Sequence, residues 1–593
     1  MSKLTIYEKD VLERQATHLI GTLGHVSEGK STLIRALTGI KTQRHQKEQE
    51  RNITIHLGYA NCKVYQSTLT GELEAIKTSD PAPSDSTLIA HLSFVDCPGH
   101  EAFLATMLGG ASIMDTACLI IASNQEVIPQ PQTHEHLIAA HLMGLKRFIV
   151  LQNKLDLLSK EGAIENHKKI QKFLEGTWAE QSPLFPISAQ HGWNIHHVLD
   201  SITSLSPPER NLNGPCLLTC VRSFDVNKPI QWKKEESKMI GAVIGGTLQK
   251  GVLCIGDWIE IRPGLIKEDK AYPLLTQVKG IRCEEKELPY AIPGSLIAIQ
   301  TTLDPSLSIA NGLVGQQIGT PGTLPALQGT LAIKFRSMNR DIHPFEKASV
   351  GDKVKVSYNV MTVSGTIIDI KKKERTIQLD APLCVKEGAI VSVMRYHNEA
   401  HRELLEGCGE VVSTLEWEDV EQEEIPDISE QVNREIEWIP VEKSFFTPQT
   451  YSYSDFLEEL EEKKEEMYSG INNKKLKLKE PVLERIPKHI VFVNWAEIVN
   501  AINNPLTAIP FKQHLKEYFE SELCTTSSVN GQGQLVLAGN WKLNGVCSLL
   551  RKYVSMFKTC RQCKSTDTGL MKDGRVYKVL CGLCKSESFV DTS

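Results

Sequence analysis

The first 200 residues alternate between apolar runs of strand type and segments with a helical repeat. Thr17 to Leu23 is a run of the first kind. After a glycine-rich turn, Leu33, Ile34 and Leu37 fall on one helical face. Further strands are expected at His91 to Val95, at Thr116 to Ala122, at Arg147 to Leu151 and before Pro186, with a helix at Thr133 to Met143. The alternation predicts an α/β domain, in which residues 66–87, rich in Ser, Thr, Pro and Asp, form an exposed loop.

From Pro215 onward the pattern changes to short apolar and β-branched runs separated by Gly and Pro turns. One set of runs continues to Pro325, and a second set runs from Gly329 to Val412. Regular short strands between turn residues predict two β-barrels.

An acidic segment follows the second set of runs. Glu416 to Glu442 holds eleven acids and one basic residue, Arg434, with two prolines and no helical period. The simplest interpretation is a solvated tether. The alternative is a mimic of nucleic acid that fills a basic groove.

The last part of the chain returns to helical and mixed patterns. A helix opens near Tyr451, with an expected cap at Ser454 and an apolar side of Phe456, Leu457 and Leu460. A basic stretch precedes a mixed α and β region that ends near Phe557. This region is expected to form a small α+β domain.

Composition limits the class of protein. A chain of 593 residues is too long to fold around a single hydrophobic core. Its 41% hydrophobic and 23% charged residues are typical of a globular protein. No apolar run approaches a membrane span, the start of the chain has no secretory signal, and most of the 15 cysteines lie in apolar runs. We therefore expect a cytoplasmic protein without a membrane partner. The net charge of −6 argues against a uniformly basic nucleic-acid binder.

The glycine-rich turn has the pattern of a phosphate-binding loop between a strand and a helix. Its glycines let backbone N–H groups face phosphate oxygens, Lys30 reaches the outer phosphates, and Ser31 can ligate Mg²⁺. The residues expected around the phosphates are Gly24, His25, Val26, Ser27, Glu28, Gly29, Lys30, Ser31 and Thr32.

Two later segments carry residues suited to a nucleotide switch. Thr54 could close over Mg²⁺ and the γ-phosphate, although alone it is an ordinary β-branched residue at the start of a strand. Asp96 ends a buried strand, where an acid holds Mg²⁺ through water, and Gly99 could approach the γ-phosphate. His100 could orient the attacking water as the catalytic residue, although an isolated histidine after a turn is usually a surface residue.

The ends of two further strands carry a pattern that can recognise guanine. Asn153, Lys154 and Asp156 follow one strand, and the Asp156 carboxylate can accept the ring N1–H and the exocyclic amine. Ser188, Ala189 and Gln190 follow the next strand, where their backbone could meet the guanine carbonyl. These segments together predict binding of GTP and GDP with Mg²⁺.

These motifs resemble the γ subunit of archaeal and eukaryotic translation initiation factor 2, a relative of elongation factor Tu. The resemblance spans residues 17 to about 413. It is carried by Glu50-Arg51-Asn52-Ile53-Thr54-Ile55, by Phe94-Val95-Asp96-Cys97-Pro98-Gly99-His100, by Gln130-Pro131-Gln132-Thr133 and by Arg222-Ser223-Phe224-Asp225-Val226-Asn227-Lys228-Pro229. It implies a GTPase that carries methionyl initiator tRNA in its GTP state to the small ribosomal subunit and mRNA.

The chain departs from that family in two places. Only Cys62 stands where family members commonly carry a zinc knuckle, and Glu28 replaces the usual histidine of the loop. A carboxylate beside a triphosphate is repulsive unless it is turned away or neutralised.

The C-terminal part shows a second resemblance, to the core of the β subunit of the same factor. Phe492-Val493-Asn494, Gly531-Gln532-Gly533-Gln534-Leu535-Val536 and Leu550-Arg551-Lys552-Tyr553-Val554 carry it. In that family the helix matching Tyr451 to Leu460 docks on the GTPase domain. The resemblance implies a γ subunit fused to its β partner, with the docking contact made within one chain.

Two Cys-x-x-Cys pairs near the C-terminus predict a zinc site. Cys560, Cys563, Cys581 and Cys584 have the spacing of a tetrahedral Zn²⁺ site on a ribbon of strands, and four thiolates leave no position open for water. Disulfides are the alternative. Basic residues on the ribbon could contact RNA or only keep the ribbon soluble.

The expected fold is therefore multidomain: an α/β phosphate-loop GTPase domain, two β-barrels, a linker, a helix, a small α+β domain and a C-terminal zinc ribbon. The expected segments are 1–16 (N-terminal tail), 17–208 (GTPase), 209–325 (first barrel), 326–413 (second barrel), 414–450 (acidic linker), 451–489 (docking helix and basic linker), 490–557 (α+β) and 558–593 (ribbon). Expected further partners are an α-type subunit, a GTPase-activating factor and an exchange factor, with slow hydrolysis in the absence of an activating partner. The alternative function is a regulator or decoy that binds initiation components with little GTP turnover.

Overall fold

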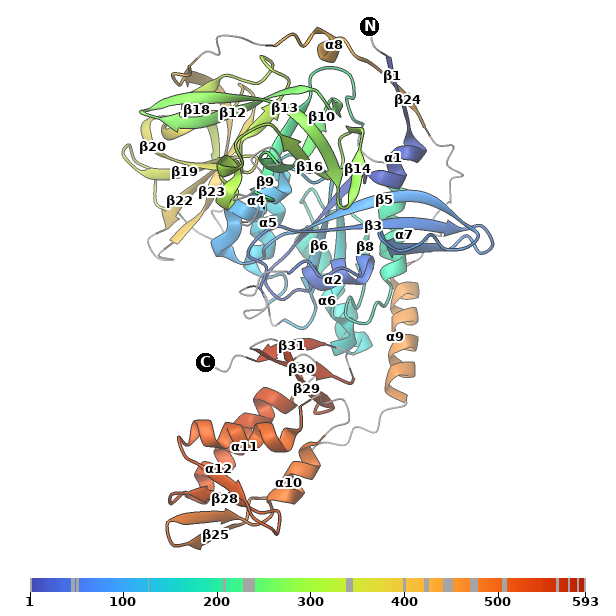
Figure 1. The fold of residues 1–593 in the computed structure, drawn as a ribbon, viewed down its shortest axis with the longest axis vertical. Coiled ribbons are helices and arrows are strands. Elements are labelled where there is room, and N and C mark those ends of the chain that lie inside the picture. The colour runs from blue at the N-terminus through green and yellow to red at the C-terminus, as the bar shows by residue number, and fades with distance from the viewer. Residues whose placement is uncertain are drawn as a thin grey trace. The chain divides into compact units, whose positions relative to one another are not determined.

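The computed structural model describes residues 3–590 except 44–47, 49–52, 126, 206–208, 228–239, 338–344, 398–401, 421–425, 441–451, 470–477, 504–508, 562–564, 574–575 and 584–585. The chain divides into two compact units (Figure 1). The first comprises Met1–Thr42, Thr54–Ala189 and Asn194–Glu458, and the second comprises Gln43–Ile53, Gln190–Trp193 and Glu459–Ser593.

The first unit begins with an α/β domain built on a seven-stranded sheet of order β4-β3-β5-β2-β6-β7-β8. Strands β5, β2, β6, β7 and β8 run parallel, while β3 pairs antiparallel with β5 and β4 pairs antiparallel with β3. The strands are β2 (His18–Leu23), β3 (Gly58–Ser67), β4 (Leu73–Lys77), β5 (Ser86–Asp96), β6 (Thr116–Ala122), β7 (Phe148–Asn153) and β8 (Leu184–Pro186). The helices are α2 (Lys30–Thr38), α4 (Leu104–Ala111), α5 (Pro131–Leu142), α6 (Lys160–Leu174) and α7 (Ile195–Ser204), with 3-10 turns η1 (Glu101–Phe103) and η2 (Leu155–Leu157).

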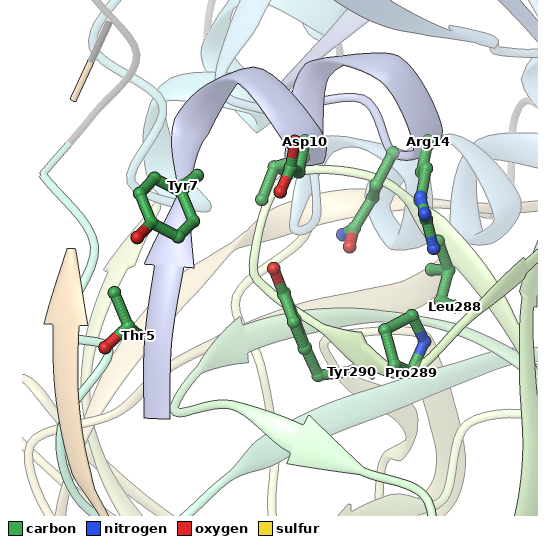
Figure 2. A pocket seen from close by; sticks show the side chains of 9 residues that line it. Thr5, Tyr7, Asp10, Arg14, Leu288, Pro289 and Tyr290 are labelled. Atoms are coloured by element: carbon green, nitrogen blue, oxygen red, sulfur yellow. The ribbon is translucent and has the colours of Figure 1, made fainter. Parts of the chain in front are cut away.

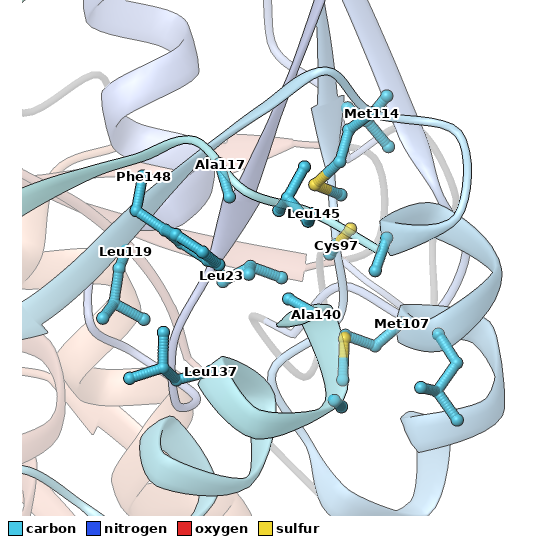
Figure 3. Close-up of a cluster of buried hydrophobic side chains, with 14 of the residues drawn as sticks. Leu23, Cys97, Met107, Met114, Ala117, Leu119, Leu137, Ala140, Leu145 and Phe148 are labelled. Atoms are coloured by element: carbon cyan, nitrogen blue, oxygen red, sulfur yellow. The ribbon is translucent and has the colours of Figure 1, made fainter. Parts of the chain in front are cut away.

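Each face of this sheet has its own buried core. On one face, Leu23, Leu119 and Phe148 meet side chains of α4 and α5, among them Met107 and Leu137 (Figure 3). On the other face, side chains of α2 and α7 pack against β2, β5, β6 and β7. The apolar strand runs of the sequence are thus buried on both sides, as expected for parallel strands covered by helices.

The expected exposed loop at residues 66–87 is wrong in part. Strand β3 extends to Ser67, β4 lies inside the interval, and β5 already begins at Ser86. The exposed face of a sheet-edge hairpin tolerates Ser and Thr, so the polar composition hid the strands.

Both expected barrels are present. The first is β9 (Leu217–Phe224), β10 (Val243–Lys250), β12 (Trp258–Lys267), β13 (Lys270–Cys283), β16 (Leu296–Thr301) and β17 (Gln317–Gly319), closed by the β12–β13 pairing, with β14 (Lys286–Leu288) appended. The short strands β11 (Leu253–Cys254) and β15 (Tyr290–Ala291) pair beside it, and η5 (Pro305–Asn311) precedes β17. The second is a closed barrel of β18 (Leu327–Ser337), β21 (Glu374–Cys384), β20 (Met361–Lys371), β19 (Lys353–Tyr358), β22 (Ile390–His397) and β23 (Arg402–Glu416).

The segments expected as an N-terminal tail and a solvated tether are in part ordered and paired with each other. Strand β1 (Lys3–Tyr7), which leads into α1 (Glu8–Arg14), pairs in parallel with β24 (Glu435–Ile439) of the acidic segment, after the short α8 (Ser429–Val432). Arg434 makes two bonds to Asp257 of the first barrel, at 2.7 and 3.0 Å. The described part of the acidic segment is therefore fastened to the first barrel. Local patterning missed this because both partners are short and lie far apart in sequence.

Helix α9 (Tyr453–Ser469) starts within the first unit. The expected cap at Ser454 is wrong by two residues. The Asp455 N–H donates to Ser452 Oγ (3.3 Å) and the Ser452 N–H donates to Asp455 Oδ2 (2.7 Å), so Ser452 caps the helix reciprocally with Asp455.

The second unit contains the expected α+β domain and a ribbon of strands. The sheet consists of β25 (Leu483–Ile486), β26 (His489–Phe492), β28 (Leu535–Ala538) and β27 (Ser527–Val529), with helices α10 (Trp495–Ile502), α11 (Phe511–Glu522) and α12 (Leu543–Tyr553), which a π turn (Val554–Lys558) extends. The ribbon consists of β29 (Thr568–Asp573), β30 (Val576–Cys581) and β31 (Glu587–Val590). Leu570, Val579 and Val590 of the ribbon share one core with the helices.

Among the described residues, no helix combines the length and the apolar character that a membrane crossing requires.

Candidate nucleotide site

The glycine-rich turn connects the end of β2 to the N-terminus of α2. Gly24 and Gly29 have φ of 141° and 104°, where glycine has no steric penalty. A Cβ on Gly29 would also lie 2.2 Å from Asn153 Nδ2. Backbone N–H groups and the first turn of α2 thus converge at this loop, in the arrangement that binds anions.

Lys30 is buried beneath the loop. Its Nζ donates to Gly24 O (3.0 Å) and His25 O (2.6 Å), and burial lowers its pKa. A Cβ on Gly99 would lie 2.3 Å from Lys30 Nζ, so the segment after β5 passes directly against the lysine. The structure therefore brings Lys30 and Gly99 together, as the sequence motifs predicted.

Hydroxyl groups gather around the Asp96 carboxylate. Ser31 Oγ donates to Asp96 Oδ2 (2.6 Å), and Thr54 Oγ1 lies 3.2 Å from Ser31 Oγ and 3.4 Å from Asp96 Oδ2. Thr42 Oγ1 donates to the same carboxylate oxygen at 2.5 Å. Burial raises the pKa of Asp96, while these hydroxyls act to lower it. This set of oxygen donors fits Mg²⁺, which prefers oxygen ligands.

Thr42 was not among the residues expected from the sequence. It lies in the polar stretch after Ile40, with no strand, glycine pattern or spacing to single it out. Only the fold shows that its hydroxyl reaches Asp96.

Of the residues expected to recognise guanine, those in the first unit also lie together. The Asn153 amide donates to Glu28 O (2.7 Å) and accepts from the Ala189 N–H (3.0 Å), so it joins the phosphate loop to the loop after β8. Ser188 Oγ donates to Asp156 Oδ1 at 2.6 Å. Lys154 has a left-handed backbone, with φ of 66°, at the turn between Asn153 and Asp156. Gln190 belongs to the second compact unit.

The remaining expected residues occupy defined positions near the loop. His25 Nδ1 lies 2.9 Å from Val26 O, Ser27 has a left-handed backbone, and Thr32 is in the first turn of α2. His100 is exposed, and its Nδ1 accepts from the Ala102 N–H (3.1 Å), which caps η1. This acceptor role leaves Nε2–H of a neutral ring available to donate.

Glu28 is turned away from the mouth of the loop and buried. Its carboxylate accepts from the His25 N–H (2.5 Å). Thr133 Oγ1, at the start of α5, lies 3.2 and 3.1 Å from the two carboxylate oxygens and donates to them. Burial is the main cause that raises its pKa to about 7, against an opposing effect of Lys30. Glu28 is thus held by α5 and is only partly ionised near neutrality, which removes part of the repulsion that its sequence position suggests.

His136 supports the same loop from α5. It is buried, and its Nδ1 accepts from the Gly24 N–H at 3.3 Å. Burial lowers the pKa of His136 to about 3, so the ring is neutral and can act as an acceptor.

Both barrels contact segments that border the site. Arg222 of β9 donates from Nη2 to Leu57 O (2.5 Å), three residues after Thr54, and its guanidinium lies 5.3 Å from the centre of the Tyr59 ring. Gly109 of α4 faces the β19–β20 turn, where a Cβ would lie 3.3 Å from Val360 Cα. The barrels are thus in contact with the Thr54 segment and with the helix after Asp96.

A separate cavity of about 290 Å³ lies between α1 and the first barrel (Figure 2). Thr5, Tyr7, Asp10, Arg14 and Tyr290 are among its lining residues. None of the residues expected to bind nucleotide lines it.

The expected zinc site is described only in part. Cys560 and Cys581 are buried in the second unit, whereas Cys563 and Cys584 lie outside the described residues. The Cys560 N–H donates to Ser565 O and the Cys581 N–H donates to Ser586 O, at 2.8 and 2.9 Å. The two turns therefore share one hydrogen-bonding pattern, and the Gly582 N–H joins them through Asp567 O (2.7 Å).

An α/β domain with a phosphate loop, followed by two β-barrels in contact with its switch segments, is the architecture of a translation-factor GTPase. Residues 15–208 match the elongation factor Tu GTP binding domain, and residues 467–587 match a domain found in initiation factors 2B and 5. The chain belongs to the family of the γ subunit of eukaryotic translation initiation factor 2, and carries a β-like domain at its C-terminus.

Two relatives support this assignment, and one solved structure shares the fold. The chain is 39% identical to Drosophila melanogaster eukaryotic translation initiation factor 2 subunit 3, over 69% of this chain and 92% of the relative. It is 39% identical to Schizosaccharomyces pombe eukaryotic translation initiation factor 2 subunit gamma, over 67% of this chain and 94% of the relative. The crystal structure of the bacterial selenocysteine-specific elongation factor EF-Sec is similar in fold, with a TM-score of 0.51 and 19% identity, covering 89% of this chain and 80% of that one.

Proposed function

We propose that this chain, a GTP-binding translation initiation factor, binds methionyl initiator tRNA in its GTP state, delivers it to the small ribosomal subunit and mRNA, and releases it after hydrolysis. The observation that carries the proposal is the pair of barrel contacts at Leu57 and Gly109, which border the residues expected to sense the γ-phosphate. A change in these segments is thereby coupled to the barrels.

The residues of the loop bind and orient the nucleotide. Lys30 exchanges its two carbonyl partners for phosphate oxygens, and the N–H groups at the start of α2 donate to them. Asp156 accepts from the guanine edge, while Asn153 holds the two loops together. Ser31 and Thr54 would ligate Mg²⁺ and Asp96 would hold it through water, and the bound ion would neutralise phosphate charge.

In this proposal His100 donates a hydrogen bond to the attacking water and thereby positions it. Because Nδ1 already accepts the Ala102 N–H, Nε2–H is the atom that can reach a water molecule. The side chain can thus orient the water without taking its proton. Hydrolysis is therefore slow until an activating factor improves this geometry. The same family relationship supports an α-type subunit and an exchange factor as further partners.

Zn²⁺ is proposed as a structural ion of the ribbon, held by Cys560, Cys563, Cys581 and Cys584. The matching hydrogen bonds of Cys560 and Cys581 support this donor set, because two Cys-x-x-Cys segments with the same local backbone pairing suit a symmetric four-cysteine site. When bound, the ion cross-links the two turns.

Two binding measurements test the proposed function. Purified protein with Mg²⁺ is expected to bind GTP and GDP and to exclude ATP. Adenine lacks the two hydrogen-bond donors that the Asp156 carboxylate accepts from guanine. Filter binding of charged initiator tRNA is expected to be tighter with GTP than with GDP. Equal affinity for ATP would contradict the guanine assignment, and tRNA binding without nucleotide dependence would favour the decoy.

A further inference from the structure

The end of β7 is completed by a side chain from the appended C-terminal part of the chain. Gln152 is fully buried, directly before Asn153. Its Nε2 donates to Ala163 O (3.0 Å), and its Oε1 accepts from Tyr453 Oη at 2.7 Å. The Tyr453 ring stacks on His167, with ring centres 3.6 Å apart. The hydroxyl of α9 thus supplies the hydrogen bond to the Gln152 carbonyl oxygen.

The same turn of α9 also holds the end of β8. The Phe456 ring is buried, 5.3 Å from the ring of Phe185 and 4.8 Å from that of His197. Asn194 Nδ2 donates both to Phe456 O (2.7 Å) and to Pro186 O (2.9 Å). Residues 453–456, which we call the α9 head, therefore contact the ends of both strands that carry the guanine-recognition residues.

A displacement of Gln152 would also move Asn153, the adjacent residue, which belongs to the nucleotide site. Asn153 is the next residue, and its amide joins Glu28 O to the Ala189 N–H. Without Tyr453 Oη, the buried Gln152 oxygen would lose this partner, and buried unsatisfied acceptors drive local rearrangement. The end of β7 can relax only by moving residues that precede Asp156.

We propose that the Tyr453–Gln152 hydrogen bond positions the end of β7 for guanine recognition, so that the docked α9 head is a component of the nucleotide site. Tyr453 and Gln152 are positioning residues, since neither needs to touch the nucleotide. The proposal rests on the proposed function, because it specifies how the guanine-binding part of that site is held.

The test compares Tyr453→Phe with wild type in the full-length chain. Phenylalanine keeps the stack on His167 and removes only the hydroxyl. Dissociation of a fluorescent GDP is measured by stopped flow, and the preference for GDP over IDP is measured by competition, because IDP lacks the exocyclic amine. Tyr396→Phe is the matched control, since Tyr396 is an exposed tyrosine of the second barrel.

We expect Y453F to release GDP about fivefold or more faster and to prefer GDP over IDP less strongly, while Y396F behaves as wild type. Unchanged release, or faster release with an unchanged preference, would overturn the proposal. Phe456→Leu, which loosens the α9 head from Phe185, is the second variant. Phe456→Leu is expected to speed GDP release as well. If Y453F does not fold, unchanged GDP release from Phe456→Leu would overturn the role of the α9 head.

Failure of the proposed function would be seen separately. Wild type that binds no fluorescent GDP overturns the nucleotide site itself, before any variant is compared. Wild type that binds GDP, with release from Y453F unchanged, overturns only the positioning role of Tyr453.

Discussion

At the scale of single residues, Glu28 shows how burial can reverse the meaning of a sequence position. From the sequence alone, a carboxylate in a phosphate loop is a source of repulsion. In the fold it accepts hydrogen bonds from His25 and Thr133 and has a pKa raised to about 7. Neither Thr133 nor the burial could be inferred from spacing, because α5 lies about a hundred residues further along the chain.

Because Glu28 has this raised pKa, the stability of Glu28→Gln relative to wild type should depend on pH. Between pH 4.5 and 7 the folded protein retains a proton on Glu28 that the unfolded chain releases. Protonated Glu28 therefore makes its full contribution to the free energy of unfolding below pH 4.5. This contribution is lost as the pH rises through 7, the pKa in the folded protein. Glutamine keeps an acceptor and cannot ionise, so E28Q should gain up to about 3 kcal/mol over wild type between pH 5 and pH 8.

Thermal unfolding of the nucleotide-free protein across this pH range measures the effect. Glu175→Gln, at an exposed position of the same unit, should follow the wild-type profile. Parallel profiles for E28Q and wild type would show that Glu28 is not buried as described.

Other expected residues lie near one another in the fold because the motifs that carry them are local. Asp96 and Asn153 end parallel strands and Lys30 begins the helix after another, and the carboxyl ends of such strands meet at one edge. Thr42 escaped prediction because its position depends on how a polar segment folds back. Tyr453 was expected on a docking helix, but its partner Gln152 was not identifiable.

At the scale of elements, Arg222 is one of the side chains that link the first barrel to the segment after Thr54. Arg222 reaches the backbone just after Thr54 and lies over the ring of Tyr59. Because this guanidinium carries the hydrogen bond to that segment, its removal should weaken the coupling.

Arg222→Ala is therefore expected to reduce the difference in initiator-tRNA affinity between the GTP and GDP states by about fivefold or more. Filter binding in both nucleotide states measures this ratio. Arg282→Ala, an exposed arginine on the same barrel, should leave it unchanged. A wild-type ratio in R222A would place the coupling elsewhere, such as at the contact of Gly109 with Val360.

The hydrophobic pattern of the sequence did not predict the pairing of β1 with β24. Ile6 is fully buried in a cluster with Val11, Val252 and Ile292 of α1 and the first barrel. Gln15 adds two hydrogen bonds to the backbone of Ile292, at 2.5 and 3.1 Å. The N-terminal residues thus belong to the folded unit, although nothing in their short pattern indicates a partner more than four hundred residues away.

Ile6→Ala should weaken this pairing by about 3 kcal/mol, because it removes buried methyl groups and leaves a cavity. Amide hydrogen exchange of residues 3–7 and 435–439 reports the local opening. Thr5→Ala, which removes a half-buried hydroxyl that donates to Glu437 and leaves the apolar cluster intact, should have a smaller effect. Equal protection in I6A and wild type would mean that β24 is held mainly by Arg434.

At the scale of the whole molecule, the class and order of domains followed from the sequence because each domain has a distinct periodicity. Helices and buried strands alternate in the GTPase domain, whereas short strands and turns repeat through the barrels. The segments between domains were predicted less well. Their composition indicated solvent exposure, but their pairing depends on the surfaces beside them.

The zinc proposal predicts one tightly bound ion per chain. Because the ribbon shares its core with α11 and α12, chelation should lower the thermal stability of the second unit. Metal content and unfolding with and without chelator measure this. Cys581→Ser should lose the ion, and Cys524→Ser, at an exposed cysteine, should retain it. An intact metal-free protein of equal stability would contradict the site.

The chain leaves the first barrel at Ile439 and returns to the GTPase domain at Tyr453. Residues 440–452 span at most roughly 45 Å when extended, so the α9 head always remains within reach of its own β7. A docking contact between two separate subunits is lost on dilution and requires equal synthesis of both. In this chain it is present at any protein concentration, and every molecule carries one copy of each partner.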